Sequence, residues 1–461
     1  MDKSTKQNLE RFQYYGDLKN IVEGIGKLHS KNGTVYDVSF EIAKRGEEKL
    51  LFNVISVETD FITAFSLANL EDLDRIEGVD KKNRRITVTG LLAKDSTIGT
   101  KTSSKVVLNG YAEQCEIGQM NIKAGNTIHF DLMNFLFLGN ETRVEESEKG
   151  KKYSRSILQL EFSDFNCRIE HVEEHSIIEK LLKRQGGILN TSTLITEIID
   201  QNDYENILEK VRKLCQLLSV ARSTFINYGS YRIKDAGGNV IYELHGNPQT
   251  RPFHGNNLIA DLPEDTVKFL NSAWKAYDYH KEIFDLRRFL YGYIETYMNS
   301  FIETRSLNIA VLVDNLASRW AIKENKNLFF EEEKFSEILS ELKTRIGTLL
   351  ENLFENLKSH YKHAMLSKIG DFNRRPLDWK LKGLRSSFNI PITDDEINQF
   401  KYIRDSLAHS SLFPDDVVKT ASFFFMRHFL DRIILSILNY QGNYFDFESS
   451  TEKIFGTGEK N

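Results

Sequence analysis

A chain of 461 residues, 40% hydrophobic and 28% charged, has the composition of a soluble globular protein of about two to four domains. Its formal net charge of -5 excludes a uniformly basic surface, so any contact with nucleic acid requires a local basic patch. Three widely spaced cysteines, at 115, 167 and 215, exclude a CxxC zinc knuckle and disfavour a disulfide framework. The polar segment 1–12 and the charge-interrupted apolar run 421–438 predict neither a secretory signal nor a membrane span, so we expect a cytoplasmic protein without membrane contact.

Short segments rich in Val, Ile, Phe and Tyr follow one another from residue 33 to residue 165, separated by Gly, Asn, Asp and Lys clusters. Such segments predict β-strands, and their spacing predicts an antiparallel, sandwich-like sheet in a β-rich domain of residues 1–165. The clearest segments are 34–42, 49–58, 85–92, 105–108 and 157–162. The charged run 145–152 is expected to be a solvated loop between strands.

Helix and strand patterns mix from 166 to 262, which we expect to continue the N-terminal region. Apolar residues recur at helical spacing between Tyr204 and Arg222. Segments 224–233 and 239–244 flank the turn sequence Asp235-Ala236-Gly237-Gly238 and predict a β-hairpin.

Residues 263–445 have the pattern of an α-helical bundle, and residues 446–461 are expected to be a tail. The fold class predicted for the whole chain is therefore α+β, with several domains. Glycine and proline interrupt the helical pattern at few points. The expected helices are 264–301, with room for two helices, 303–322, 332–361, 394–409 and 415–440.

The expected helix 394–409 carries the residues most able to do chemistry. Thr393 and Glu396 have the spacing of a capping box, and Ile397, Phe400, Ile403 and Leu407 form one apolar stripe. Arg404 and His409 lie on the same helix, five positions apart, which is about 140° around the helix axis. His409 falls in the last turn, where the helix dipole favours a protonated imidazole.

The hexapeptide Arg404-Asp405-Ser406-Leu407-Ala408-His409 resembles the Arg-x4-His motif of HEPN domains. The segment 301–308, Phe-Ile-Glu-Thr-Arg-Ser-Leu-Asn, is similar to the corresponding helix of the Apea-like HEPN group of bacterial anti-phage proteins. This resemblance covers roughly residues 265–440 and is weaker in the β-rich region. It implies a C-terminal HEPN bundle that dimerises through the motif helix to form a composite cleft.

The resemblance implies a metal-independent endoribonuclease without a cofactor, acting on tRNA or other host RNA in abortive infection, with a phage-derived trigger at the N-terminal region. The chemistry is consistent with the residues, since RNA supplies the 2′-OH nucleophile, His409 transfers protons and Arg404 stabilises the phosphorane. The products would be a 2′,3′-cyclic phosphate and a 5′-OH, and DNA would resist. Asp405 is a candidate catalytic residue that orients Arg404 or His409, whereas Ser406 and Glu303 are secondary polar candidates.

A locally basic segment, 358–385, precedes the motif helix and contains interleaved aromatic residues. It is either an RNA-contacting surface with stacking on tryptophan, or a solvated linker whose tryptophan packs on the bundle. The candidate RNA contacts are Arg374, Arg375, Trp379, Lys380, Lys382 and Arg385.

Two other functions stay open at this point. The first is a HEPN-fold module that binds RNA or protein without cleaving. The second is a zinc peptidase, since His171-Val172-Glu173-Glu174-His175 matches the HxxEH pattern. That segment is expected to straddle the boundary between a strand and a helix, where the two histidines cannot share a helical face.

Overall fold

The computed structural model describes most of the chain, and the described residues group into two compact units. The N-terminal unit consists of Met1–Asn257 and Asp261–Leu270, and the C-terminal unit consists of Leu258–Ala260 and Asn271–Asn461. The described residues are 18–45, 49–56, 73–98, 105–147, 150–184, 188–247, 251, 257–298, 301–353, 366, 368, 372–447 and 449–455.

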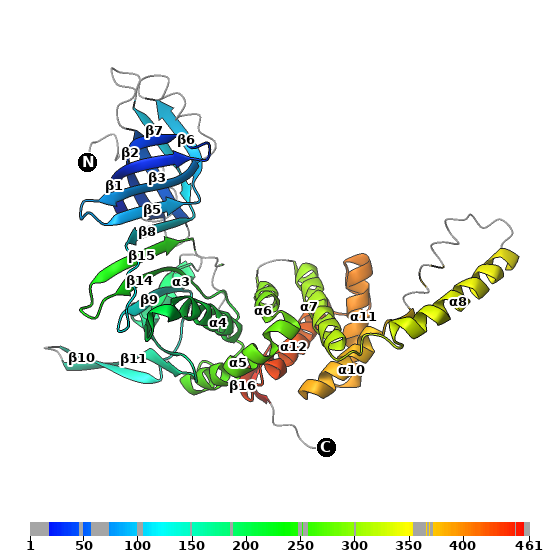
Figure 1. The fold of residues 1–461 in the computed structure, drawn as a ribbon. Coiled ribbons are helices and arrows are strands. Elements are labelled where there is room, and N and C mark those ends of the chain that lie inside the picture. Colours follow the sequence, from blue (N-terminus) through cyan, green and yellow to red (C-terminus); the bar gives the residue numbers. More distant parts are fainter. Residues whose placement is uncertain are drawn as a thin grey trace. The chain divides into compact units, whose positions relative to one another are not determined.

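The described part of the N-terminal unit is built on one antiparallel sheet of fifteen strands (Figure 1). Its strand order is β10-β11-β12-β13-β9-β14-β15-β8-β5-β4-β1-β2-β3-β7-β6. The strands are β1 Leu18–Ser30, β2 Val35–Arg45, β3 Lys49–Ser56, β4 Leu73–Asp80, β5 Arg85–Thr89, β6 Leu92–Ile98, β7 Val106–Ala112, β8 Gln114–Gly118, β9 Thr127–Met133, β10 Glu141–Ser147, β11 Gly150–Glu161, β12 Asn166–His171, β13 Asn190–Glu197, β14 Asn227–Lys234 and β15 Val240–Gly246.

Alternating burial explains why these segments form strands with one face on a core. In β7 and β9 every second side chain is buried, as the twofold periodicity of a half-buried strand requires. β7 and β8 are separated only by Glu113, and they pair with β3 and β5 respectively, so β1 to β8 wrap around one apolar core. The Phe40 ring fills the part of that core next to Gly24 of β1, where β1 has no side chain. A Cβ atom at Gly24 would lie only 2.6 Å from Phe40 Cζ.

The structure confirms the predicted antiparallel sheet in this half of the chain and corrects one expectation. The described strands form one continuous hydrogen-bonded sheet. The charged run 145–152 belongs largely to strands, because β10 and β11 pair as a hairpin in which Glu145 is in register with Lys152.

Other expectations for the N-terminal unit are confirmed. A helix, α4 (Tyr204–Arg222), covers the predicted range and buries its apolar stripe. The predicted hairpin is β14–β15, where Asp235 Oδ1 accepts a hydrogen bond from the Asn239 amide at 2.8 Å. Its turn contains Gly238 at φ +82°, a left-handed conformation that favours glycine. Among the described residues this unit also contains α3 (His175–Arg184) and a 3₁₀ turn (Gln201–Asp203).

Helices dominate the described part of the C-terminal unit, as the sequence predicts (Figure 1). The expected segment 264–301 is two helices, and the expected helix 332–361 is described only as far as residue 353. The described helices are α5 Pro263–Phe284, whose first residues up to Leu270 belong to the N-terminal unit, α6 Leu286–Glu295, α7 Ile302–Lys323, α8 Glu332–Leu353, α10 Leu377–Phe388, α11 Asp394–Ser410 and α12 Lys419–Ile437. Among the described residues no helix is both long and apolar enough to cross a membrane.

Two elements of this unit were not predicted. Much of the basic segment is α10, which buries Leu381 and Leu384 and packs so closely on α7 that Gly383 lies against the Trp320 ring. The expected tail begins inside a hairpin of β16 (Gly442–Asp446) and β17 (Thr451–Phe455).

Candidate functional site

The motif helix α11 begins at the predicted cap. The Thr393 side chain accepts a hydrogen bond from the Glu396 amide at 3.2 Å, and Glu396 Oε2 accepts one from the Thr393 amide at 2.7 Å. Glu396 also accepts a hydrogen bond from Arg432 of α12 at 2.6 Å. The predicted stripe of Ile397, Phe400, Ile403 and Leu407 is buried, so α11 presents its opposite face to solvent in a fixed rotation.

Two carboxylates orient Arg404 on that helix. Its Nη1 donates to Asp405 Oδ1 at 2.8 Å, and its Nη2 donates to Asp314 Oδ2 of α7. Partial burial alone would lower the pKa of Arg404, but its hydrogen bonds to Asp405 and Asp314 raise it above its usual value. The side chain is 28% exposed and has more N–H donors than these two contacts use, so a phosphate can still approach it.

Asp314 is the part of this site that the sequence did not reveal. It lies eleven positions after Glu303 on α7, which is about three helical turns, so both carboxylates share one face of the helix. Glu303, the predicted candidate, does not contact the motif residues and accepts a hydrogen bond from Lys419 at 3.0 Å. That contact with Lys419 lowers the pKa of Glu303.

The His409 side chain is exposed in the last turn of α11 and forms no hydrogen bond or ion pair with any described residue. The helix stays regular through Ser410 and ends at Ser411, which adopts the left-handed conformation at φ 59°. The five-residue separation therefore keeps its helical angle of about 140°, and one chain does not direct His409 toward the contacts of Arg404. Ser406 donates to the Leu412 carbonyl at 2.9 Å and thus stabilises the turn after the helix.

The predicted RNA-contacting residues separate into two groups. Lys382 and Arg385 both form ion pairs with Asp394 at the start of α11, at 3.0 and 2.6 Å. Lys380 donates to Ser318 of α7 at 3.3 Å. These three side chains therefore hold α10 against its neighbours. The basic segment also includes Lys358 and Lys362, which lie outside the described residues.

The second group forms an aromatic and basic platform, which we define as Phe329, Phe372, Arg374, Arg375 and Trp379. The Arg375 guanidinium stacks over the Trp379 ring at 3.7 Å and lies 5.6 Å from the Phe329 ring centre. Phe329 and Phe372 are 49% and 63% exposed, and Arg374 is exposed. Stacked arginine and exposed aromatic rings are the groups on which unpaired bases stack.

Asn373 holds this platform together. Its side chain donates to the Phe330 carbonyl at 2.9 Å and accepts a hydrogen bond from the Phe330 amide at 2.8 Å. The Asn373 carbonyl also accepts a hydrogen bond from the Phe329 amide at 2.8 Å. The loop after α7 and the segment before α10 are therefore fixed to one another.

The possible zinc site straddles a strand and a helix, as expected. His171 ends β12 and is buried, whereas His175 begins α3, and the two ring centres are 5.7 Å apart. Burial, together with the neighbouring His175, lowers the pKa of His171 to about 3. Within the described ranges, no group of three or more His, Cys, Asp and Glu side chains is arranged to hold a metal ion.

With the geometry of the motif helix established, we compared the chain with known proteins. No protein-family model matches it, and neither a curated protein nor a solved structure is significantly similar to it.

Proposed function

We propose that this chain is a metal-independent endoribonuclease of the HEPN type, with Arg404 and His409 as its catalytic residues. The observation that carries the proposal is the chemistry of one solvent-facing helix. It presents a guanidinium oriented by two carboxylates and, at its last turn, an imidazole without a partner among the described residues. A fixed cation and a free proton carrier are the two groups that cleavage of RNA by its own 2′-OH requires.

Each side chain has a defined role in this proposal. His409 takes the proton of the 2′-OH or returns one to the departing 5′ oxygen, and its exposure leaves both ring nitrogens accessible. Arg404 donates hydrogen bonds to the phosphate as negative charge grows on it. Asp314 and Asp405 act as positioning residues, because they fix the guanidinium before RNA binds. A substrate without a 2′-OH is not cleaved.

A homodimer is part of the proposal, because one chain does not direct His409 and Arg404 to the same point. Exposed apolar side chains surround the motif helix and support contact with a second copy. They lie on α7, on α11, in the turn after α11 and at the start of α12. They are Val311, Tyr402, Leu412 and Val418, which are 57%, 51%, 56% and 72% exposed.

The aromatic and basic platform supports RNA as the substrate. It belongs to the same unit as the motif helix, and α10 connects the two, since Trp379 is on α10 and Lys401 of α11 pairs with Asp378 of α10 at 3.4 Å. We infer that unpaired bases stack on this platform while the cleaved phosphate lies at Arg404. Host RNA such as tRNA, a cytoplasmic role in abortive infection, and a phage-derived trigger acting on the N-terminal unit complete the proposal.

The test is cleavage of purified tRNA and rRNA by the full-length protein, with EDTA present throughout. Wild type should cleave, and His409→Ala and Arg404→Ala should each lower the rate by at least about a hundredfold. His175→Ala and Arg319→Ala are matched controls, since they remove the same side chains elsewhere and should leave the rate unchanged. Cleavage by His409→Ala at the wild-type rate would refute the assignment.

A module that binds RNA without cleaving it is the second candidate, favoured by the carboxylates that already neutralise Arg404. It predicts RNA binding that depends on Trp379 but no 2′,3′-cyclic phosphate product from any preparation. Product analysis by end-group labelling therefore distinguishes the two functions.

A further inference from the structure

Four strands of the N-terminal unit carry a row of hydrogen-bond acceptors side by side. In the strand register Glu23 of β1 faces Glu41 of β2, Glu41 faces Asn53 of β3, and Asn53 faces Asn109 of β7. Like charges directly opposite one another on neighbouring strands destabilise a sheet. The Glu23–Glu41 pair is therefore unfavourable, and among the described residues only Lys81 forms an ion pair with it, at Glu23.

Asn53 has an unsatisfied side-chain oxygen in this row. Its side chain is 7% exposed, and its Oδ1 is buried without a hydrogen-bond donor. The Asn109 Oδ1 is buried and without a donor as well. A buried amide oxygen without a partner is unfavourable, so a ligand that donates to it gains an interaction the protein alone lacks.

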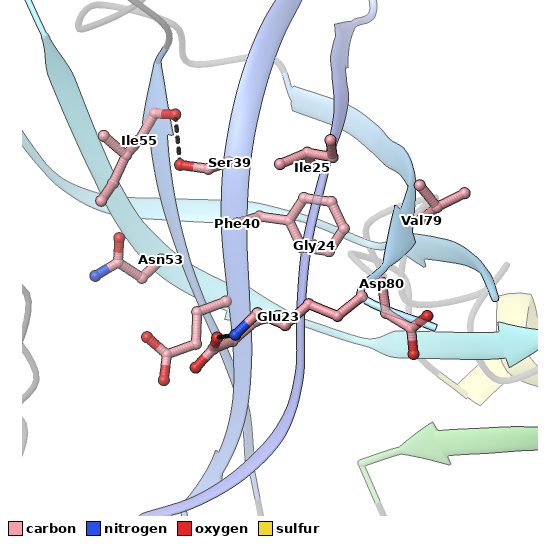
Figure 2. Close-up of a pocket in the computed structure, with 11 residues that line it drawn as sticks. Glu23, Gly24, Ile25, Ser39, Phe40, Asn53, Ile55, Val79 and Asp80 are labelled. Carbon is pink, nitrogen blue, oxygen red and sulfur yellow. Dashed lines mark hydrogen bonds and ion pairs between the residues drawn. The ribbon is translucent and has the colours of Figure 1, made fainter. Parts of the chain in front are cut away.

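Asn53 lines a pocket of about 330 Å³ on the strands β4, β1, β2 and β3 (Figure 2). Ile25, Ile55 and Val79 form apolar walls, and Figure 2 shows Ile25 and Val79 on one side of the pocket and Asn53 on the other. Glu23 and Glu41 line it too, so the pocket combines an apolar wall with an acidic end.

The acidic end of the pocket contains a carboxylate, that of Glu41, which is available to a ligand. Burial, and the charge of Glu23, raise the pKa of Glu41, and no described residue forms an ion pair or hydrogen bond with the Glu41 carboxylate. Asp80, by contrast, accepts hydrogen bonds from Arg84 and from the Lys82 amide and is saturated. Lys81 reaches Glu23 at 3.1 Å but is 86% exposed, so its ammonium occupies only the rim.

We propose that this pocket binds an organic cation with an aliphatic stem, an alkylammonium or guanidinium group, whose N–H donors reach Glu41 and Asn53. The apolar walls accept the stem, and several N–H donors on one cationic head match several acceptors in one row. A bare metal ion does not fit, because among the described residues no three His, Cys, Asp or Glu side chains are arranged there to hold one. This inference does not depend on the proposed nuclease activity.

Two sources share this chemistry, a free polyamine and a basic side chain of a protein partner. Isothermal titration calorimetry on the full-length protein uses agmatine and spermidine for the first source. For the second it uses a blocked Gly-Ser-Arg-Ser-Gly peptide, with the Arg→Gln peptide and n-pentanol as uncharged counterparts. Saturable binding of either cation, with none for the counterparts, supports the proposal, and the arm that binds more tightly identifies the source.

Some variants should weaken binding and one should strengthen it, so the test distinguishes loss of the site from misfolding. Glu41→Gln and Asn53→Leu should each weaken binding about tenfold, through loss of a charge-assisted or buried hydrogen bond. Lys81→Gln should strengthen it about threefold, because it removes the competing cation, and a misfolded protein cannot produce that gain. Glu197→Gln, an exposed carboxylate on β13, should change nothing. Absence of saturable binding up to about 10 mM, or binding unaltered by the Glu41 and Asn53 variants, would overturn the proposal.

Discussion

Arg404 illustrates how neighbouring carboxylates turn a flexible surface cation into a directed one. Its guanidinium is held from its own helix by Asp405 and from α7 by Asp314, so the planar group has a fixed orientation before any phosphate arrives. Pre-orientation of this kind lowers the entropy that substrate binding must remove. His409 has no such partner among the described residues and owes its position to the helix end alone.

The role of Asp314 can be tested separately from its effect on stability. Asp314→Asn should lower kcat for RNA cleavage about tenfold with KM within about twofold, because the guanidinium loses orientation but keeps its charge. The ion pair is about one-third exposed, so the free energy of unfolding should change by less than about 1 kcal/mol. Steady-state kinetics on a defined RNA and urea denaturation measure the two quantities.

Asp285→Asn is the matched control, since Asp285 lies 3.6 Å from the surface Arg319 in the same unit. It should leave kcat unchanged. An unchanged kcat in Asp314→Asn as well would mean that Arg404 needs no carboxylate from α7.

The sequence was informative about residues only where the signal was local. Arg404, Asp405 and His409 could be nominated because they lie within six consecutive positions of one helix. Asp314 is ninety positions from Arg404, and only the packing of α7 against α11 brings their side chains together. The aromatic and basic platform could not be predicted for the same reason. Phe329 and Arg375 are distant in the sequence, and only the folded chain brings their side chains together.

At the scale of elements, α11 was predictable because cap, stripe and termination all lie in its own sequence. α10 was not, because its many basic residues suggested a solvated linker, and its burial against α7 depends on the small Gly383 beneath Trp320. β1 precedes the predicted strand region because glycines interrupt its apolar pattern, and those glycines are needed where the strand approaches β4 closely.

The cap of α11 predicts a pH dependence. Burial of Glu396 acts to raise its pKa, but its contacts with Arg432 and Thr393 lower it overall. A carboxyl group whose pKa is lowered by folding contributes stability that is complete above its unfolded pKa, about 4.3, and is lost as the pH falls through the lower folded value. Glu396→Gln should therefore cost about 1–2 kcal/mol at pH 7 and progressively less below about pH 4.

Urea denaturation followed by tryptophan fluorescence measures the free energy of unfolding of the C-terminal unit, which contains Glu396. The signal comes from that unit because Trp274, Trp320 and Trp379 all belong to it. Asp395→Asn, an exposed acid in the same first turn, should have a smaller effect. A Glu396→Gln penalty that stays constant from pH 7 to pH 3 would contradict the electrostatic origin.

At the scale of the whole molecule, the helical angle between Arg404 and His409 predicts shared active sites in a dimer. An equimolar mixture of Arg404→Ala and His409→Ala proteins, each inactive alone, should recover about a quarter of wild-type activity after subunit exchange. Half of the dimers would then be mixed, and each mixed dimer would hold one intact site. No recovery, despite exchange demonstrated with differently tagged chains, would mean that both residues act within one chain.

The α+β class and the helical C-terminal half were readable from composition and periodicity, whereas the strand order was not. β9 pairs with β13 and β14, and β8 pairs with β15 and β5, so neighbours in the sheet are far apart in the chain. Local sequence patterns indicate which segments are strands. They carry no information about which distant strand pairs with a given strand.

That strand order also has a consequence for how the chain is made. One edge of β8 pairs with β15, which follows more than a hundred residues later in the chain. That edge of β8 therefore stays unpaired until about half the chain has been synthesised. Pairings over such separations form slowly, whereas helices form from neighbouring residues in microseconds. Helix α11, which bears both Arg404 and His409, is synthesised after the sheet and forms by the faster local steps. The sheet and the motif helix therefore form at different rates during translation.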